Sequence, residues 1–217
     1  MIDGIRFKVC GLTALVDAEF ADRCGADYLG FNLYPKSPRF ISLTQYSSMA
    51  KFLPDRRKVA VLVEPTAAEL RTMLSAGFDF FQVHFGLETP VETLAEWSEI
   101  VSPERLWLAP KLPPATDLAP EFLRFAKFFL LDTFQQGVFG GTGKPGDWPK
   151  FARHRLAQPA KTWILAGGLN PENIGEALRA SGARFVDVNS GVEAAAGVKD
   201  HAKLKRFVAE LHRAAGQ

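Results

Sequence analysis

The feature of the sequence that most restricts its fold is a glycine motif that recurs at multiples of one spacing. The motif appears as Gly25-Ala-Asp-Tyr, Gly77-Phe-Asp-Phe and Gly182-Ala-Arg-Phe, each between a run of helical periodicity and a short apolar run. Glycine suits the left-handed conformation in which many helices end. The spacings correspond to two and four units of roughly 26 residues, and eight such units would occupy nearly the whole chain.

Eight apolar runs alternate with segments of helical periodicity, which predicts eight strands separated by helices. The strands are expected at residues 7–9, 28–32, 59–63, 80–84, 106–109, 128–132, 163–166 and 185–189. Helices are expected between them, for example at residues 14–23, 66–76, 171–180 and 202–214. The pattern predicts an α/β fold, a (βα)8 TIM barrel, formed by a single domain over residues 1–217.

Helix and loop signals agree with this assignment. Thr66 with Glu69 forms a capping box, and Asn170 with Pro171 is typical of an N-cap followed by the first helical residue. The prolines at positions 110, 113, 114 and 120 predict a long loop after the fifth strand. An open, doubly wound sheet is the alternative fold, but it usually has fewer strands and a nucleotide-binding fingerprint in its first βα turn.

The balance of charge excludes some classes of partner. The chain has 26 Lys and Arg against 24 Asp and Glu, a net charge of +2, which argues against binding to nucleic acid or to an anionic membrane surface. No signal peptide or membrane-spanning run is apparent, so we expect a cytoplasmic protein. Cys10 and Cys24 are therefore expected to be reduced thiols at opposite ends of the barrel.

In a barrel of this kind the active site lies at the C-terminal ends of the strands. Gly167-Gly168 follows the seventh expected strand and Ser190-Gly191 follows the eighth. Glycines in these two loops let backbone N–H groups approach an anion, and this is the usual phosphate site of the fold. The alternative is that they serve only tight turns. Because two adjacent loops agree, we expect a small phosphorylated substrate.

Residues 141–146 match the pattern of a dinucleotide-binding loop, G-x-G-x-x-G, but not its context. The fingerprint must follow its strand immediately and precede an acidic residue at the end of the next strand. Here the string begins well after Asp132, and the next expected strand ends in Ala166. We interpret the segment as a glycine-rich lid over the substrate, with Gly141 among the binding residues.

Two residues could carry acid–base chemistry. Cys10 follows the first strand and Asp132 ends the sixth, which is otherwise apolar, so the two should face each other across the barrel mouth. A base and an acid on opposite sides of a pocket suit a proton-transfer reaction that needs no cofactor and no metal. The alternatives are a small buried thiol at Cys10 and a simple loop cap at Asp132.

Several of these segments together resemble the phosphoribosylanthranilate isomerases of tryptophan biosynthesis. They occur in family order over nearly the whole chain: Lys8-Val-Cys-Gly-Leu-Thr13, Gly30-Phe-Asn-Leu-Tyr-Pro-Lys-Ser-Pro-Arg39, Gln82-Val-His84, Asp132-Thr133, Gly140-Gly-Thr-Gly-Lys144, Asp147-Trp148, Gly167-Gly-Leu-Asn-Pro-Glu-Asn173 and Asp187-Val-Asn-Ser-Gly-Val-Glu193. The departures from the family pattern are local: Phe85 before Gly86, Pro145-Gly146 in the lid, Asn189, and Ala196 before Gly197.

The resemblance implies an Amadori rearrangement of N-(5-phosphoribosyl)anthranilate to 1-(2-carboxyphenylamino)-1-deoxyribulose 5-phosphate. By analogy, Asp132 is the general acid and Cys10, as a thiolate, is the general base. Arg39 corresponds to the family arginine that holds the anthranilate carboxylate, and Asp187 to an aspartate near the substrate. His84 is a substrate-binding candidate, with a packed histidine at a strand end as the alternative.

Two other classes of function stay open at this point. One is a different phosphate-binding barrel enzyme, such as a flavin oxidoreductase or a sugar-phosphate lyase that uses a Schiff-base lysine. The sequence argues against the lyase because no lysine stands at a strand end in a clearly apolar pocket. The other class is a non-catalytic phosphosugar-binding protein, against which the presence of both Cys10 and Asp132 argues. For the quaternary structure, both a monomer and a homodimer are compatible with the sequence.

Overall fold

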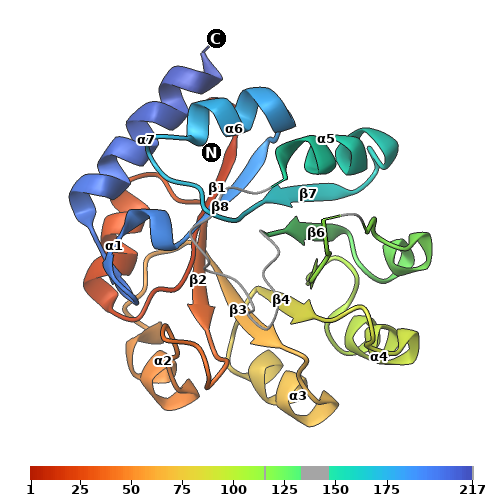
Figure 1. Ribbon diagram of the computed structural model, residues 1–217. Helices are drawn as coiled ribbons and strands as arrows, with labels where there is room; N and C mark the ends of the chain where they lie inside the picture. Colours follow the sequence, from red (N-terminus) through yellow and green to blue (C-terminus); the bar gives the residue numbers. More distant parts are fainter. Residues whose placement is uncertain (115, 133–146, 217) are drawn as a thin grey trace.

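Eight short strands, each preceded or followed by polar turns, close into a parallel barrel in the computed structural model, which describes residues 1–114, 116–132 and 147–216 (Figure 1). The strands are β1 Arg6–Val9, β2 Tyr28–Asn32, β3 Arg57–Val63, β4 Phe80–Phe85, β5 Leu106–Pro110, β6 Phe128–Leu131, β7 Thr162–Leu165 and β8 Phe185–Val188. They pair in chain order, and β8 closes the barrel by pairing with β1, Lys8 opposite Asp187. The TIM barrel predicted from the sequence is confirmed.

The connecting helices surround the barrel (Figure 1). They are α1 Leu15–Arg23, α2 Leu43–Ala50, α3 Ala67–Ser75, α4 Val91–Val101, α5 Trp148–Ala157, α6 Ile174–Ser181 and α7 His201–Ala215. The described part of the β5–β6 connection contains a 3₁₀ helix, η1 Pro120–Phe125, and no α-helix. A short hairpin of β9 Glu193–Ala195 and β10 Val198–Lys199 precedes α7.

Most local predictions are confirmed, with corrections at some boundaries. Gly25, Gly77 and Gly182 all have positive φ angles, as their positions after helices predict. Thr66 and Glu69 form both hydrogen bonds of a capping box at the start of α3. The expectation that Asn170 directly caps a helix is wrong.

The region around Asn170 begins with a turn instead of a helix. The Asn170 side chain accepts hydrogen bonds from the amides of Glu172 and Asn173, which holds residues 171–173 in that turn. Regular α6 starts only at Ile174, with Asn173 as its N-cap. The other boundary correction is Pro110, which is the last residue of β5 and so precedes the loop that was expected to contain it.

The interior of the barrel has two layers of different chemistry. The lower layer begins at the start of the strands with Tyr28, Phe128 and Phe185 and reaches Leu130 and Ala166 near their ends; its other members are Val59, Trp107, Ala109 and Ile164. Above it, toward the ends of the strands, lie the buried polar side chains of Lys8, Gln82 and Asp187. Side chains alternate across a strand, so Gln82 and Asp187 point inward two positions after Phe80 and Phe185, which pack in the layer below.

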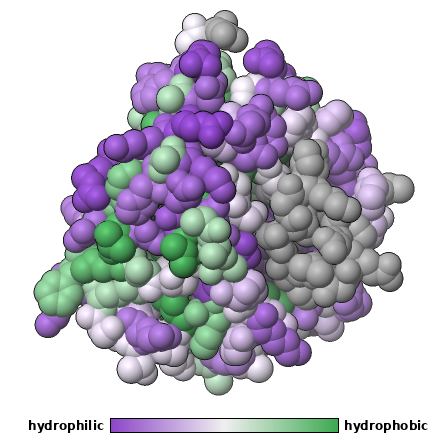
Figure 2. Space-filling model, turned by 60° about the vertical axis from the view of Figure 1, so that its left-hand side comes forward, coloured by the Kyte–Doolittle hydropathy of each residue, from purple (hydrophilic) through white to green (hydrophobic). Residues whose placement is uncertain are grey.

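The outer surface combines polar and apolar residues. Figure 2 shows hydrophilic residues over the upper part of one face and hydrophobic residues gathered at its lower left. The large apolar side chains exposed in the described residues are Met1, Val16, Phe40, Phe52, Leu156 and Val198. Among the helices of the described ranges, none combines the length and apolar character needed to cross a membrane.

Candidate active site

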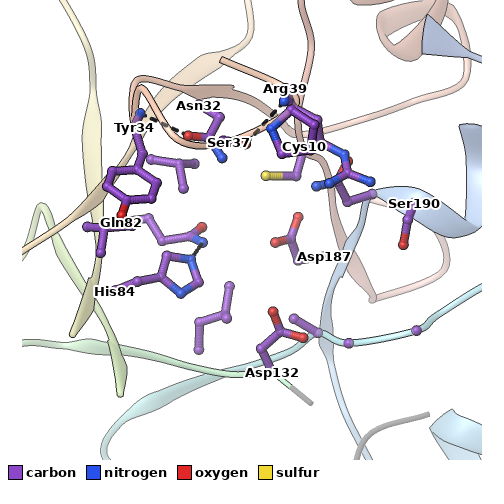
Figure 3. A pocket seen from close by; sticks show the side chains of 18 of the residues that line it. Cys10, Asn32, Tyr34, Ser37, Arg39, Gln82, His84, Asp132, Asp187 and Ser190 are labelled. Atoms are coloured by element: carbon purple, nitrogen blue, oxygen red, sulfur yellow. Dashed lines mark hydrogen bonds between the residues drawn. The ribbon is translucent and has the colours of Figure 1, made fainter. Parts of the chain in front are cut away.

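A cavity of about 400 Å³ lies at the C-terminal ends of the strands (Figure 3). Eight of the ten predicted site residues line it: Cys10, Arg39, Asp132, His84, Asp187, Gly167, Gly168 and Ser190. Gly191 lies beside the cavity and is not part of its lining. Gly141 belongs to residues 133–146, outside the part that the structure describes. The cavity therefore brings together side chains from β1, β4, β6 and β8 and from the loops after β2, β7 and β8.

Cys10 stands immediately after β1 with its side chain toward the cavity (Figure 3). Its amide donates a hydrogen bond to the carbonyl of Val188 at 2.9 Å, which fixes the end of β1 to β8. The residue is only 5% exposed. Burial raises the pKa of the Cys10 thiol, and the positive charge of Lys8 partly opposes this effect. The thiol is therefore the resting form near neutral pH, and the thiolate has to be formed against the cost of burial.

Asp132 comes directly after β6 on the inward-facing alternation that includes Phe128 and Leu130. Its carboxylate lines the cavity on the side away from Cys10, with Asp187 between the two in the view of Figure 3. The predicted arrangement of a thiol and a carboxyl on different sides of one cavity is thus present. Neither residue is displaced into the packing between strands and helices.

A buried ion pair that the sequence analysis did not identify lies beneath these residues. Lys8 of β1 is 0% exposed, and its ammonium donates to both carboxylate oxygens of Asp187 at 3.0 Å. Burial alone would lower the pKa of Lys8, but the charges of Asp187 and Cys10 outweigh it and raise that pKa above its usual value. Lys8 is therefore a fixed cation inside the barrel. A charged, ion-paired amine is a poor nucleophile, which further disfavours a Schiff-base lyase.

Arg39 is held at the cavity by a second network of charges. Its Nε and Nη2 donate to the carboxylate of Glu193 at 2.7–3.1 Å, and Lys199 donates to the same carboxylate at 3.0 Å. The hydrogen bonds that Arg39 donates to Glu193 are the main reason why the pKa of Arg39 lies above its usual value. Burial would raise the pKa of Glu193, but the hydrogen bonds and charges of Arg39 and Lys199 lower it. Arg39 is consequently charged and oriented before any ligand arrives.

Gly11 leaves the space in which the network of Arg39, Glu193 and Lys199 lies close to the end of β1. Gly11 has a φ of 69°, and a Cβ added there would lie 2.7 Å from Cδ of Arg39 and 2.6 Å from Oδ1 of Asn189. Asn189, one of the departures from the family pattern, accepts a hydrogen bond from Lys199 at 2.9 Å. Glycine after Cys10 therefore gives Arg39 and Asn189 the space to approach the cavity.

Gln82 and His84 are two residues apart on β4, so both side chains face the cavity (Figure 3). Their Nε2 atoms are 2.8 Å apart, so the Gln82 amide donates when His84 Nε2 carries no proton. Burial, with a smaller contribution from the charge of Lys8, lowers the pKa of His84 to about 4. His84 is therefore a neutral imidazole near pH 7. Its neighbour Phe85 points away from the cavity and packs against Trp97 and Phe122.

The loops after β7 and β8 have the backbone geometry expected of an anion site. Gly167 and Gly168 have φ angles of 88° and 61°, and within the described residues their amides donate no hydrogen bond. Ser190 begins a single 3₁₀ turn, η2 Ser190–Val192. A Cβ at Gly191 would overlap the carbonyl oxygen of Leu169, so this glycine lets the two loops pack together.

These features are compatible with acid–base chemistry on a small anionic substrate. Arg39 and the Gly167–Gly168 loop offer sites for two negative groups, and Cys10 and Asp132 line the same cavity at the mouth of the barrel. In the described residues no group of three His, Cys, Asp or Glu side chains is arranged to hold a metal ion.

Comparison with known proteins agrees with this arrangement. Residues 7–210 match the sequence model of the family described as N-(5'-phosphoribosyl)anthranilate (PRA) isomerase. The chain is also 36% identical to the N-(5'-phosphoribosyl)anthranilate isomerase of Neisseria gonorrhoeae, over 96% of this chain and 97% of that protein. The chain belongs to the phosphoribosylanthranilate isomerase family.

Solved structures of the family have the same fold. A crystal structure of monomers generated from the dimeric phosphoribosylanthranilate isomerase of Thermotoga maritima superimposes with a TM-score of 0.79 at 33% identity, covering 98% of this chain and all of that one. A second isomerase structure, in complex with reduced 1-(o-carboxyphenylamino)-1-deoxyribulose 5-phosphate, has a TM-score of 0.73 at 31% identity and covers 98% of this chain and 100% of that one. The family assignment therefore extends over nearly the whole barrel.

Proposed function

We propose that this member of the family uses Cys10 as general base and Asp132 as general acid to rearrange phosphoribosylanthranilate. The activity, an isomerase reaction of tryptophan biosynthesis on an aldose-type sugar phosphate, is that of the family. The roles of the two residues are supported by one observation above all. A thiol and a carboxyl from β1 and β6 line one cavity that also contains a fixed arginine and a glycine-rich loop.

The proposed reaction moves one hydrogen from C2 to C1 of the ribose. Asp132 gives its proton to the furanose ring oxygen, and the bond between that oxygen and C1 breaks to leave an iminium at C1. The Cys10 thiolate then removes the proton from C2, and the electron pair forms the double bond of an enolamine. C1 then takes up a proton from solvent and the C2 hydroxyl releases one to solvent, which gives the ketone product. Proton exchange with solvent returns Cys10 and Asp132 to their starting forms.

The substrate is proposed to lie with its two anionic ends at different walls of the cavity. Arg39 would bind the anthranilate carboxylate, because a guanidinium presents paired donors to a carboxylate. The amides of Gly167 and Gly168, together with Ser190 and Gly191, would bind the phosphate. Asp187 and neutral His84 face the space between these ends, where the ribose hydroxyls would lie. The proposed role of Gly141 rests on the sequence alone.

The activity is tested directly with enzymatically generated phosphoribosylanthranilate. Addition of the protein should make the anthranilate fluorescence of the substrate disappear, at a rate proportional to the protein concentration. Ligand binding without a change in fluorescence would instead indicate a phosphosugar-binding protein. A purified protein with flavin absorbance would favour an oxidoreductase and contradict the absence of a cofactor from the proposed mechanism.

The phosphate site is tested by adding negative charge at a glycine that already has a positive φ angle. Gly168→Asp should abolish measurable turnover because a carboxylate would repel the substrate phosphate. Gly77→Asp is a matched control, since Gly77 also has a positive φ, lies at the other end of the barrel and has open space around its Cα. Inorganic phosphate should inhibit the wild-type protein competitively. Full activity of Gly168→Asp would place the phosphate elsewhere.

We also propose that the active protein is a monomer or a homodimer. A dimeric relative from Thermotoga maritima supports the second possibility. Sedimentation equilibrium across a range of protein concentrations, with activity measured at each one, would distinguish the two states. The cytoplasmic location expected from the sequence stays a prediction.

A further inference from the structure

The proposed mechanism leaves one buried charge near Cys10 without a role. Lys8 is fully buried inside the barrel, and its ammonium is fixed by two contacts of 3.0 Å to Asp187. The contact joins β1 to β8 at the position where these strands close the barrel, with Lys8 opposite Asp187 in the register. A buried ion pair seldom adds net stability, because both charges lose their hydration. Its presence directly below a proposed base therefore calls for a chemical explanation.

The neighbouring strand β2 has a glycine where it passes the Lys8 side chain. Gly30 of β2 lies beside the Lys8 side chain, and a Cβ at Gly30 would be 2.8 Å from Cε and 3.0 Å from Nζ of Lys8. The same Cβ would be 3.1 Å from the Cα of Cys10. The absence of a side chain at Gly30 thus allows the aliphatic part of Lys8 to pass β2, with the Lys8 ammonium inside the barrel.

Lys8 and Cys10 are two residues apart on β1, so their side chains point to the same, inner side of the barrel. The charged and titratable groups that surround the thiol are Lys8 on β1, Arg39 in the loop after β2, His84 on β4, Asp132 after β6, Asp187 on β8, Glu193 on β9 and Lys199 on β10. Burial raises the pKa of the thiol most, Lys8 is the largest opposing influence, Asp187 raises the pKa further and Lys199 lowers it.

We propose that Lys8 is a positioning residue of this active site: its buried ammonium, held by Asp187, stabilises the thiolate form of Cys10. The proposal rests on the function proposed for Cys10, which needs a thiolate to remove the C2 proton. Ionisation releases the thiol proton to solvent, and the negative charge then lies on sulfur, next to the ammonium. Asp187 and the thiolate itself both favour the protonated form of Lys8, so the ammonium stays charged while Cys10 is ionised.

The decisive comparison is between two variants that differ only in the charge of Lys8. Both carry Cys24→Ser, so that Cys10 is the single thiol of the chain. The first is Asp187→Asn, and the second is Asp187→Asn with Lys8→Met, which preserves side-chain length and leaves no unpaired carboxylate. The thiolate is followed by its absorbance near 240 nm and by the rate of alkylation with iodoacetamide, both as a function of pH and without substrate.

In the variant with Lys8→Met, the pH at which Cys10 ionises should be at least about one unit higher than in Asp187→Asn alone. At any pH below both midpoints, this shift corresponds to about a tenfold smaller fraction of thiolate. The Cys24→Ser protein with both native charges should fall between the two variants. Lys161→Met is the matched control, because Lys161 binds the carbonyl of Ala126 at the opposite end of the barrel. It should leave the ionisation of Cys10 unchanged.

Equal midpoints in the two variants would overturn the proposal and leave Lys8 a purely structural residue. If circular dichroism shows that the variant with Lys8→Met does not fold, Lys8→Gln in the same Asp187→Asn background is used instead, because it also removes the charge of Lys8 but keeps a polar side chain. The pH at which Cys10 ionises should again be higher than in Asp187→Asn, and an unchanged midpoint would overturn the proposal. The titration needs no turnover. A Cys10→Ser variant with wild-type activity would therefore refute the function proposed for Cys10 independently of the result for Lys8.

Discussion

The lower and upper layers of the barrel interior come from the same eight strands but have opposite chemistry. The lower layer packs aromatic rings against one another, such as Tyr28 on Phe185 with ring centroids 4.9 Å apart. The upper layer contains an ion pair, a thiol and a carboxyl. On β8 the change occurs between Phe185 and Asp187, two residues apart. One strand can therefore stabilise the fold with its first residues and carry chemistry with its last ones.

This division predicts that stability and activity can be altered separately. Burial of aromatic surface in the lower layer stabilises the folded state. Burial of a charge pair such as Lys8 and Asp187 in the upper layer adds little net stability, because both charges lose their hydration. Substitutions of Cys10 or Asp132 in the upper layer should change kcat with a nearly constant melting temperature, and those in the lower layer should do the reverse.

The largest effects are expected at the two proposed acid–base residues of the upper layer. Cys10→Ser replaces the thiol with a hydroxyl that is too weakly acidic to act as a base, and Asp132→Asn removes the transferable proton. Each should lower kcat by at least about 10²–10⁴-fold, the usual contribution of a general acid or base. Fluorescence assays give kcat, and thermal unfolding should show little change in either variant.

Two further measurements test these roles. In the wild type, kcat should rise with pH as Cys10 ionises, and this limb should start above the usual range of thiols because burial raises the pKa of Cys10. The double variant should lose less than the product of the two single losses, because both residues serve one reaction pathway. Turnover of Cys10→Ser at the wild-type rate would reduce the thiol to core packing, and another base, such as Asp187, would have to be sought.

The next largest effect tests the lower layer. Phe185→Ala removes a ring that is stacked on Tyr28 and packs edge-on against Trp107. The free energy of unfolding should fall by about 3–5 kcal/mol, the usual cost of removing a buried aromatic ring. Below the melting temperature, kcat per folded molecule should stay near the wild-type value. Phe52→Ala, at a phenylalanine that is 59% exposed, is the control.

A large loss of kcat in folded Phe185→Ala would show that the two layers are mechanically coupled. Loss of stability in Phe52→Ala of the same size as in Phe185→Ala would also contradict the comparison, because it would show that burial in the lower layer is not the cause. Denaturant unfolding monitored by tryptophan fluorescence gives both free energies under the same conditions.

The fold could be predicted from the sequence because its signals are local and repeated. Strand runs, helix periodicity and the glycines at 25, 77 and 182 each follow from backbone preferences, and all eight strands occur at the expected places. The helix α6 starts later than the sequence predicts, because a turn at Asn170 satisfies the same backbone amides as an N-cap would. An asparagine followed by a proline is compatible with both a turn and a helix N-cap, so the sequence does not distinguish them at Asn170.

Much of the cavity could also be predicted, since the ends of barrel strands mark the active site. The ion pairs that support it could not. Glu193 bonds Arg39 from 154 positions further along the chain, and Lys8 meets Asp187 across 179 positions. Nothing local in either segment specifies its partner. One signal was available: a lysine two residues before Cys10, on the inward-facing side of a strand, has to be buried and paired.

A third prediction concerns the stability of the protein at acidic pH, which His84 in the upper layer should reduce. Burial lowers the pKa of His84 from 6.5 to about 4, so the unfolded chain binds more protons than the folded protein between these pH values. Stability should therefore fall as the pH falls through this window, by at most about 3 kcal/mol. His84→Gln removes the titrating group, and denaturant unfolding at several pH values should show a smaller acid loss in this variant. Equal acid losses in both proteins would contradict a neutral His84.

The smallest effect is expected at Arg39, which borders the upper layer without belonging to a strand. Its guanidinium is already oriented by Glu193, so binding of the substrate carboxylate needs little further ordering. Arg39→Ala should lower kcat/KM by about 10–150-fold, the value of one charge-assisted hydrogen-bonding contact, about 1.5–3 kcal/mol. Arg39→Lys should recover little, because an ammonium cannot bond Glu193 and the ligand with the same fork. Arg56→Ala, at an arginine paired with Asp22, should leave kcat/KM unchanged. A substrate analogue without the carboxylate should distinguish poorly between wild type and Arg39→Ala, and an unchanged kcat/KM for the natural substrate would remove Arg39 from the site.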